Sequence, residues 1–150
     1  MELALRKATR DDLRLLGEIR ARTILAQPET FWNKQELQIA ADAWATMDVQ
    51  NDFDNHEIYI YLHNGVEAGF VSWKGAYLAY LFTLPEIQSS GVGSALLKFA
   101  ESAIRPTHNY IWLIAHPYSE KFYEKHGFKK QPETEIPFGT TRLHKFLKTF

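Results

Sequence analysis

The sequence predicts one domain, residues 1–150, of mixed α/β (α+β) type, in which helices pack against a central sheet. The chain has 150 residues, 45% of them hydrophobic, which is enough for one sizeable core and suits one domain better than two. The apolar pattern has a helical period near the N-terminus and changes to strict alternation after residue 57. An apolar run, a glycine loop and another helical pattern follow over residues 77–104. These observations favour the order β-α-α-β-β-β-α-β-α-β-β.

The bulk composition excludes several classes of protein. A formal net charge of -1 gives no chain-wide attraction to nucleic acid or to an anionic membrane. Cysteine is absent, which excludes a disulfide framework and a thiolate nucleophile, and we expect no metal site. The N-terminus does not resemble a signal peptide, and no apolar run approaches the length of a membrane span. We therefore expect a cytoplasmic protein without nucleic-acid or membrane partners.

The N-terminal third is predicted to contain a strand and two helices. Residues 3–8 form a short strand, and Thr9 with Asp12 three residues later is typical of a helix start. That helix carries an apolar stripe and ends before Pro28; the stripe contains Leu13, Leu16, Ile19 and Thr23. A second stripe predicts the next helix, with Leu37, Ala40, Ala41, Trp44 and Met47 on one face. A polar loop, residues 50–55, separates these helices from the sheet.

The middle of the chain is predicted to form three consecutive strands. Alternation over residues 58–63 indicates a half-buried strand, and Asn64-Gly65 is a strong hairpin signal. Residues 66–73 are the partner strand, and Lys74-Gly75 turns the chain into the run at 77–84. This run is apolar on both faces, as expected of a central strand covered by helices.

The C-terminal half is predicted to alternate helices and strands. A stripe from Leu96 to Ile104 indicates a helix that Pro106 ends, and residues 110–115 form a buried strand. Residues 119–126 form a short helix, with Gly127 at the position of a left-handed cap. Two closing strands, residues 128–133 and 141–148, are expected around a turn at 137–139.

The glycine loop is the first candidate for chemistry. Gln88-Ser-Ser-Gly91-Val-Gly93 follows a strand and opens a helix, and such a turn presents free N–H groups and a positive dipole end to an anion. The loop lacks the lysine and spacing of a nucleotide P-loop and is not a dinucleotide G-x-G-x-x-G motif. By itself it is a weak signal, since such loops also serve only to turn the chain.

A second segment, His116 to Phe128, lies one strand later, and the two segments together resemble the GCN5-related N-acetyltransferase (GNAT) superfamily. Residues 85–97 are similar to that family's pyrophosphate loop, and Phe-Tyr-Glu-Lys-His-Gly-Phe at 122–128 is similar to its following helix. The resemblance covers nearly the whole chain. It implies a mixed, mostly antiparallel sheet of about seven strands, splayed between the fourth and fifth strands and flanked by about four helices.

The resemblance implies acetyl-coenzyme A (acetyl-CoA) as co-substrate and an amine as acceptor. Backbone N–H groups of the loop would bind the pyrophosphate, and the end of the central strand would pair through its backbone with the pantetheine arm. The cofactor-binding residues implied in this way are Phe82, Thr83, Leu84, Gln88, Ser89, Ser90, Gly91, Val92, Gly93 and Ser94. A backbone N–H in the splay would polarise the thioester carbonyl.

Three residues of the second segment have implied or alternative roles. Tyr123 matches the family tyrosine that protonates the departing thiolate, which a phenol can do; the alternative is a core tyrosine. His116 stands where many members carry an asparagine that contacts pantetheine, and a histidine can make the same kind of hydrogen bond or simply end the strand. Tyr118 either lies along the coenzyme or packs.

The acceptor side is less clearly marked. Many members use a glutamate on the central strand as general base, but residues 75–84 contain no carboxylate. The candidates to help, each with an equally good surface or packing role, are Tyr80, Glu86, His56 and His63. The family's acceptor pocket corresponds here to residues 26–32 and 133–140, where Phe31, Trp32 and Phe138 either form an apolar wall or pack in the core.

The leading hypothesis is an acyl-CoA-dependent N-acyltransferase that acetylates a primary amine of a small molecule or a protein by direct attack, with Tyr123 as general acid. An alternative is a CoA-binding module that senses without catalysis, which the missing strand carboxylate and His116 favour. A third is a toxin that acetylates aminoacyl-tRNA, against which the near-neutral charge argues. Monomer and homodimer are both compatible with the sequence.

Overall fold

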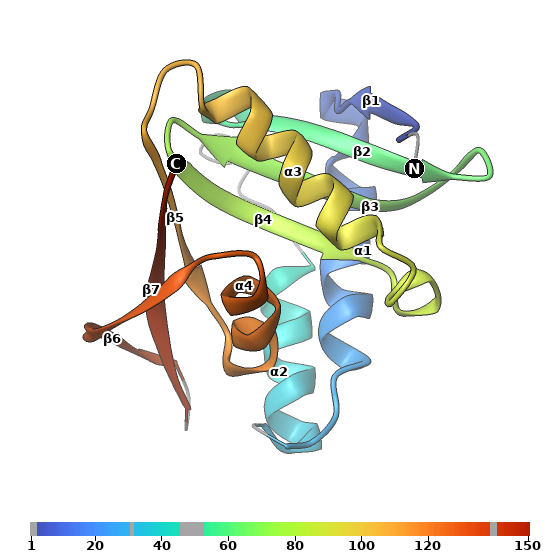
Figure 1. Cartoon of the computed structure of the whole chain (residues 1–150). Coiled ribbons are helices and arrows are strands. Elements are labelled where there is room, and N and C mark those ends of the chain that lie inside the picture. The colour runs from blue at the N-terminus through green and yellow to red at the C-terminus, as the bar shows by residue number, and fades with distance from the viewer. Residues whose placement is uncertain (1–2, 31, 46–52, 139–140) are drawn as a thin grey trace.

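Seven strands form one mixed sheet in the order β1-β2-β3-β4-β5-β7-β6 (Figure 1). The computed structural model describes residues 3–30, 32–45, 53–138 and 141–150. The strands are β1 Leu5–Lys7, β2 Glu57–His63, β3 Val66–Lys74, β4 Tyr77–Thr83, β5 Tyr110–Ala115, β6 Lys129–Phe138 and β7 Thr141–Thr149. Neighbouring strands are antiparallel except β4 and β5, which are parallel. The predicted fold class is confirmed.

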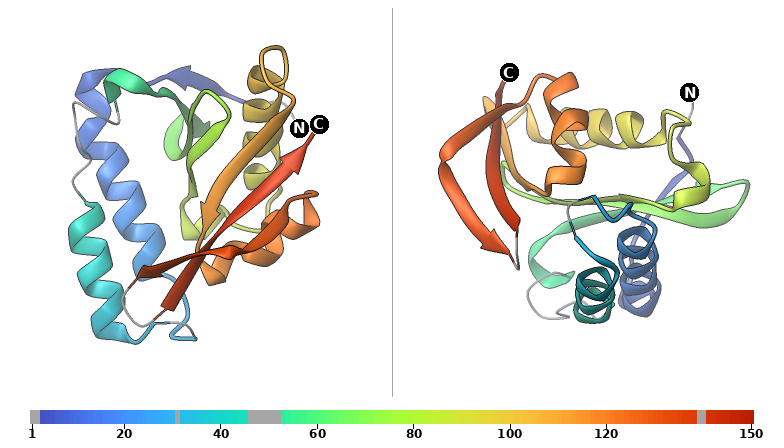
Figure 2. Two further views of the ribbon diagram at one scale, coloured as in Figure 1. Left: turned by 90° about the vertical axis from the view of Figure 1, so that its left-hand side faces the viewer. Right: turned by 90° about the horizontal axis from the view of Figure 1, so that it is seen from below.

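Helices cover both faces of the sheet. In Figure 2 (right), α1 and α2 lie below it, and α3 and α4 lie on the opposite face. Their bounds are α1 Leu13–Leu25, α2 Lys34–Trp44, α3 Val92–Ile104 and α4 Glu120–Lys125, with short 3-10 turns at Arg10–Asp12, Pro85–Ile87 and Pro117–Ser119. Of the described helices, none is long and apolar enough to cross a membrane.

The sheet opens between β4 and β5. The two strands share a single registered pair, Tyr77 with Trp112, and diverge beyond it (Figure 1). A register shift between Ser72 and Trp73 of β3 leaves Ala79 without a direct partner, so β4 bulges just as it leaves β5. Because the strands are parallel, the opening lies at their carboxyl ends, next to the loop that begins α3.

The predicted start of the first helix is confirmed in its contacts. The Thr9 backbone N–H donates to the Asp12 carboxylate over 2.8 Å, and Arg6 on β1 forms an ion pair with the same carboxylate at 2.8 Å. These bonds hold the pKa of Asp12 at about 2, with the Arg6 hydrogen bond as the main cause. The helix enters through a 3-10 turn before α1.

The closing hairpin differs from the prediction. β6 continues to Phe138, so Pro137 and Phe138 belong to the strand and not to a turn. A shift in register between Gln131 and Ile136 absorbs the extra residues. There the Thr134 hydroxyl accepts from the Lys145 N–H at 3.0 Å and donates to the Gln131 carbonyl at 2.7 Å, replacing ladder bonds that the irregular strand lacks. Side-chain bonding of this kind was not foreseen from apolar periodicity.

Candidate active site

The loop before α3 has the backbone of an anion cradle. Ser89 and Gly91 have left-handed φ values of 67° and 87°, and Gly91 is the residue that caps α3. The first helical bond runs from the Ala95 N–H to the Gly91 carbonyl, at 3.1 Å, so the N–H groups just before Ala95 have no acceptor inside the helix. The Ser90 hydroxyl donates to the Ile87 carbonyl and closes the turn. The loop residues 88–91 are exposed, as a ligand-binding turn requires.

The pairing of β4 with β3 limits which backbone groups can face the opening. The Leu84 N–H donates to the Ala68 carbonyl at 2.9 Å, and the Leu84 carbonyl accepts from the Ile87 N–H at 3.1 Å. Backbone groups alternate in direction along an antiparallel ladder, so those of Phe82 also point to β3, and those of Leu81 and Thr83 point away from it. This geometry narrows the expected partners of a pantetheine arm from residues 82–84 to Thr83, and adds Leu81.

Two side chains already hold the Thr83 carbonyl. The Gln88 side-chain amide donates to it at 3.1 Å, and the Thr23 hydroxyl of α1 lies 3.3 Å away while also contacting the Ile19 carbonyl at 2.8 Å. Gln88 thus acts here through its side chain and fixes the loop against the end of β4. The Thr83 N–H is then the group of this residue that a ligand could accept from.

Tyr123 is deeply buried on α4. Its side chain is 8% exposed, and its ring packs edge-on against Phe122 and Phe128, with centroids 5.1 and 5.6 Å apart. Burial raises the pKa of the Tyr123 phenol above its ordinary value, which keeps it protonated at neutral pH. Within the described part of the chain, the phenol makes no hydrogen bond that would fix its proton elsewhere.

His116 follows β5 at the open side of the sheet. Its ring meets Trp32 edge-on at 5.4 Å. Burial, with a smaller contribution from the Arg20 cation, lowers the pKa of His116 to about 4. The ring is therefore neutral at neutral pH and can exchange one hydrogen bond as donor and one as acceptor. Tyr118, in the turn that follows, is 42% exposed.

The structure separates the four candidates for the general base. Glu86 pairs with Arg22 at 2.9 Å on the surface, and its own backbone N–H and then Arg22 lower its pKa. His63 is hydrogen-bonded to the Tyr61 hydroxyl at 2.9 Å on β2, two strands from β4. Tyr80 lies on β4 itself, 6.3 Å from the His56 ring. Of the four candidates, Tyr80 and His56 are therefore the two whose rings lie near each other.

On the predicted acceptor side, Trp32 is the described aromatic residue whose surroundings can be compared with the prediction. Trp32 is 4% exposed and belongs to a small core between α1 and α2, with Ile24, Leu37, Ala40 and Ala41. The same ring touches His116, so it both packs and borders the opening. Phe31 and residues 139–140 lie outside the described residues, as does the Phe138 side chain. Whether they form an apolar wall stays a prediction.

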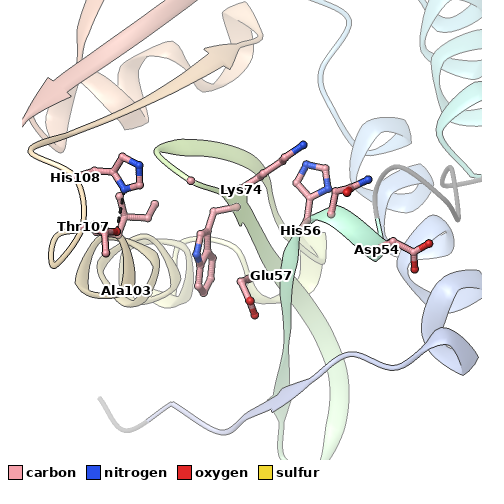
Figure 3. Close-up of a pocket in the computed structure, with 11 residues that line it drawn as sticks. Asp54, His56, Glu57, Lys74, Ala103, Thr107 and His108 are labelled. Atoms are coloured by element: carbon pink, nitrogen blue, oxygen red, sulfur yellow. Dashed lines mark hydrogen bonds between the residues drawn. The ribbon is translucent and has the colours of Figure 1, made fainter.

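A cavity of about 290 Å³ lies elsewhere, at the start of β4 and the end of α3 (Figure 3). His56, Lys74, Thr107 and His108 border it, and Thr107 is hydrogen-bonded to His108 at 3.0 Å. The 13-residue α3 separates this cavity from the glycine loop by roughly 20 Å. It is therefore distinct from the opening between β4 and β5. Among the described residues, no group of His, Cys, Asp and Glu is arranged to hold a metal.

Two contacts at the site were not predicted. Arg20 is 8% exposed on the apolar stripe of α1, with its guanidinium 4.6 Å from the Tyr80 ring centre. His126 of the second segment hydrogen-bonds Ser94 of the loop at 2.8 Å. The only sequence signal for the first was an arginine among apolar stripe positions. The second joins residues 32 apart and has no local signature.

A strand pair opened beside the N-terminus of α3 is the arrangement that the resemblance to acyl-CoA-dependent N-acyltransferases implies. A sequence profile described as "Acetyltransferase (GNAT) domain" matches residues 22–149. The chain belongs to the GNAT acetyltransferase family. A comparison with curated proteins found no match.

Solved structures share the fold at low sequence identity. One is the GCN5-related N-acetyltransferase "Aminotransferase, Class-II" of Rhodopseudomonas palustris, with TM-score 0.81, 18% identity, and 100% of this chain and 97% of that chain covered. Another is the PaiA N-acetyltransferase of Thermoplasma acidophilum in complex with coenzyme A, with TM-score 0.77, 19% identity and 100% of both chains covered. The structure of yncA of Salmonella typhimurium with acetyl-CoA has TM-score 0.64 and 16% identity, with 99% of this chain and 94% of that chain covered.

Proposed function

We propose that this protein transfers the acetyl group of acetyl-CoA to a primary amine by direct attack, with Tyr123 as general acid. The observation that carries the proposal is the opening of the sheet after the Tyr77–Trp112 pair, directly beside the left-handed turn that begins α3. The pyrophosphate binds the N–H groups of residues 89–94, and the pantetheine arm runs along β4 toward its bulge. The similar PaiA and yncA structures, described with coenzyme A and acetyl-CoA, support this donor.

The neutral amine attacks the thioester carbon, the carbon–sulfur bond of the tetrahedral intermediate breaks, and the thiolate of coenzyme A leaves with the electron pair. Tyr123 donates its phenolic proton to that thiolate. The phenol is protonated at neutral pH, and the exclusion of water that raises its pKa also raises the basicity of the thiolate that accepts the proton. The amine nitrogen loses its extra proton to solvent, and the Tyr123 phenolate later regains a proton from solvent. His116 is neutral at neutral pH, so it hydrogen-bonds an amide of the pantetheine arm without adding charge.

Turnover of acetyl-CoA tests the proposal. Release of free thiol is measured with a panel of small amines, peptide N-termini and lysine peptides. We expect Tyr123→Phe to lower kcat by about 100-fold and to change the KM for acetyl-CoA by less than about threefold, because the phenol acts after binding. Tyr110→Phe is the matched control, since it removes the same atom from an exposed tyrosine that has no proposed role at the site. Equal kcat in Tyr123→Phe and wild type would remove Tyr123 from the mechanism.

One observation favours a second function. The described β4 carries no carboxylate, and the base candidate on β4 itself is Tyr80, whose neighbour His56 borders the separate cavity. A CoA-binding module that senses without catalysis would need no base. Tight binding of acetyl-CoA with no thiol release across the whole panel would support that function over catalysis.

A further inference from the structure

His126 joins the two segments that carry the proposed site. It caps the end of α4 and is partly buried. Its Nδ1 lies 2.7 Å from the Phe122 carbonyl oxygen, and its Nε2 lies 2.8 Å from the Ser94 hydroxyl in the first turn of α3. Phe122 completes the contact: its ring lies 4.5 Å from the His126 ring, and a side chain added at Gly93 would touch it at 3.6 Å.

The first bond determines the direction of the second. A carbonyl oxygen only accepts, so Nδ1 of His126 carries a proton. In the neutral ring Nε2 then has only a lone pair, and the Ser94 hydroxyl must donate its hydrogen to it. In the imidazolium both nitrogens donate, and the Ser94 hydrogen is released for another acceptor.

Ser94 is the third residue of α3, and its own N–H belongs to the unpaired donors of that helix end. A pyrophosphate there offers only acceptor oxygens, so it is complementary to a released Ser94 hydroxyl and not to one donating to His126. Its negative charge also favours a cation nearby. We propose that His126 is a positioning residue that takes up a proton from solvent when the pyrophosphate of coenzyme A binds, and so turns the Ser94 hydroxyl toward the phosphate. This proposal rests on the proposed function.

The elements next to His126 carry other charged residues. These are Lys98 and Glu101 on α3; Lys148 on β7; Lys129 and Lys130 at the start of β6; and Glu120, Lys121, Glu124 and Lys125 on α4 itself. Lys148 lies against Gly127 and is paired with Glu101 at 3.0 Å. All of these are present before and after binding, so the charge that changes at the N-terminus of α3 is that of the ligand.

Proton uptake on binding tests the proposal. The probe is dephospho-coenzyme A, which keeps the pyrophosphate and lacks the titratable 3′-phosphate. Its binding heat is measured at pH 7 in buffers of different ionisation enthalpy, and we expect net proton uptake on binding. Pantetheine, which lacks the pyrophosphate, should bind without uptake. Nitrogen NMR of the His126 ring should show Nε2 gaining a proton with the first ligand only.

Two variants separate the hydrogen bond from mere packing. Ser94→Ala should bind dephospho-coenzyme A about tenfold more weakly and with less uptake than the wild type, because the donor to the phosphate is gone and only the charge of the ligand still favours the imidazolium. His126→Gln carries an uncharged amide that can donate to the Ser94 hydroxyl or accept from it at all pH values, so it should keep affinity within about threefold and show no uptake. Binding by the wild type without uptake, or equal uptake in either variant, would overturn the proposal and leave the proposed function standing. Failure of both coenzyme A and its dephospho form to bind would overturn both.

Discussion

Folding moves the pKa of His116 from its ordinary 6.5 to about 4, because burial and then the Arg20 cation disfavour the imidazolium. The unfolded chain therefore binds a proton at this site at a higher pH than the folded chain does. Above about pH 6.5 the protonation of His116 does not lower the free energy of unfolding. As the pH falls from 6.5 toward 4, that free energy decreases by about 1.4 kcal/mol per pH unit, or about 3 kcal/mol in all.

The prediction is a pH-dependent effect of His116→Asn. At pH 7 the variant should be less stable than wild type, because it loses the contact with Trp32. That deficit should shrink by about 3 kcal/mol between pH 7 and 4, since only the wild type is losing stability at this site. Urea denaturation at several pH values measures it. Asp12→Asn is the control. Because the Asp12 pKa is about 2, the wild type loses the stability from this carboxylate only below about pH 4, so the stability difference between Asp12→Asn and wild type should stay constant above that pH. A constant deficit for His116→Asn would contradict the lowered pKa.

At the scale of elements, α1 packs so closely against the end of α2 that only a glycine fits at the contact. A side chain added at Gly17 of α1 would lie 1.8 Å from the Ala45 carbonyl oxygen at the end of α2. Backbone must move to relieve that contact, so we expect Gly17→Ala to destabilise the fold by about 1–3 kcal/mol despite the better helix propensity of alanine. Thermal and urea unfolding measure the change.

Gly93→Ala is the matched control for Gly17→Ala. The added methyl at Gly93 would meet the Phe122 ring at 3.6 Å, an ordinary contact, in a helix where alanine is favoured over glycine. Its stability should stay within about 1 kcal/mol of wild type. Similar losses in both variants would show that the cost comes from replacing a helical glycine and not from the α1–α2 contact.

The sequence predicts these elements well where one local pattern is enough. Alternation identifies β2, the Asn64-Gly65 turn identifies the β2–β3 hairpin, and the stripe beginning at Leu96 identifies α3. The prediction from sequence was wrong for the end of β6, which continues to Phe138 past a point where the Thr134 hydroxyl replaces ladder bonds. The family resemblance supplied the splay, which no local pattern of β4 encodes.

The contacts that assemble the site were harder to predict because they join distant segments. Gln88 was expected among the coenzyme-binding residues, and its side-chain amide holds the Thr83 carbonyl. Arg20 reaches Tyr80 across layers, and His126 reaches Ser94 across two helices. Each depends on how elements pack, and periodicity reports only which face of an element is buried.

At the scale of the whole molecule, the opening divides the sheet into two parts joined at β4 and β5 by one registered pair. Strands β1 to β4 form a continuous antiparallel ladder, and β5, β7 and β6 form another. A ligand that pairs with the β4 edge would connect the two parts. At 100 times its Kd, such a ligand would stabilise the folded state by about 2.7 kcal/mol.

Hydrogen exchange locates that connection residue by residue. With saturating acetyl-CoA, we expect the amides of Leu81 and Thr83, which point away from β3, and those of residues 89–94 to exchange up to about 100-fold more slowly. The Leu84 amide, already bonded to Ala68, and the amides of β2 serve as internal controls and should change less. Pantetheine should protect Leu81 and Thr83 but not the loop, because it lacks the pyrophosphate. Protection of the loop without protection of Leu81 and Thr83 would contradict strand-like pairing in the opening, since the coenzyme would then be held by its phosphates alone.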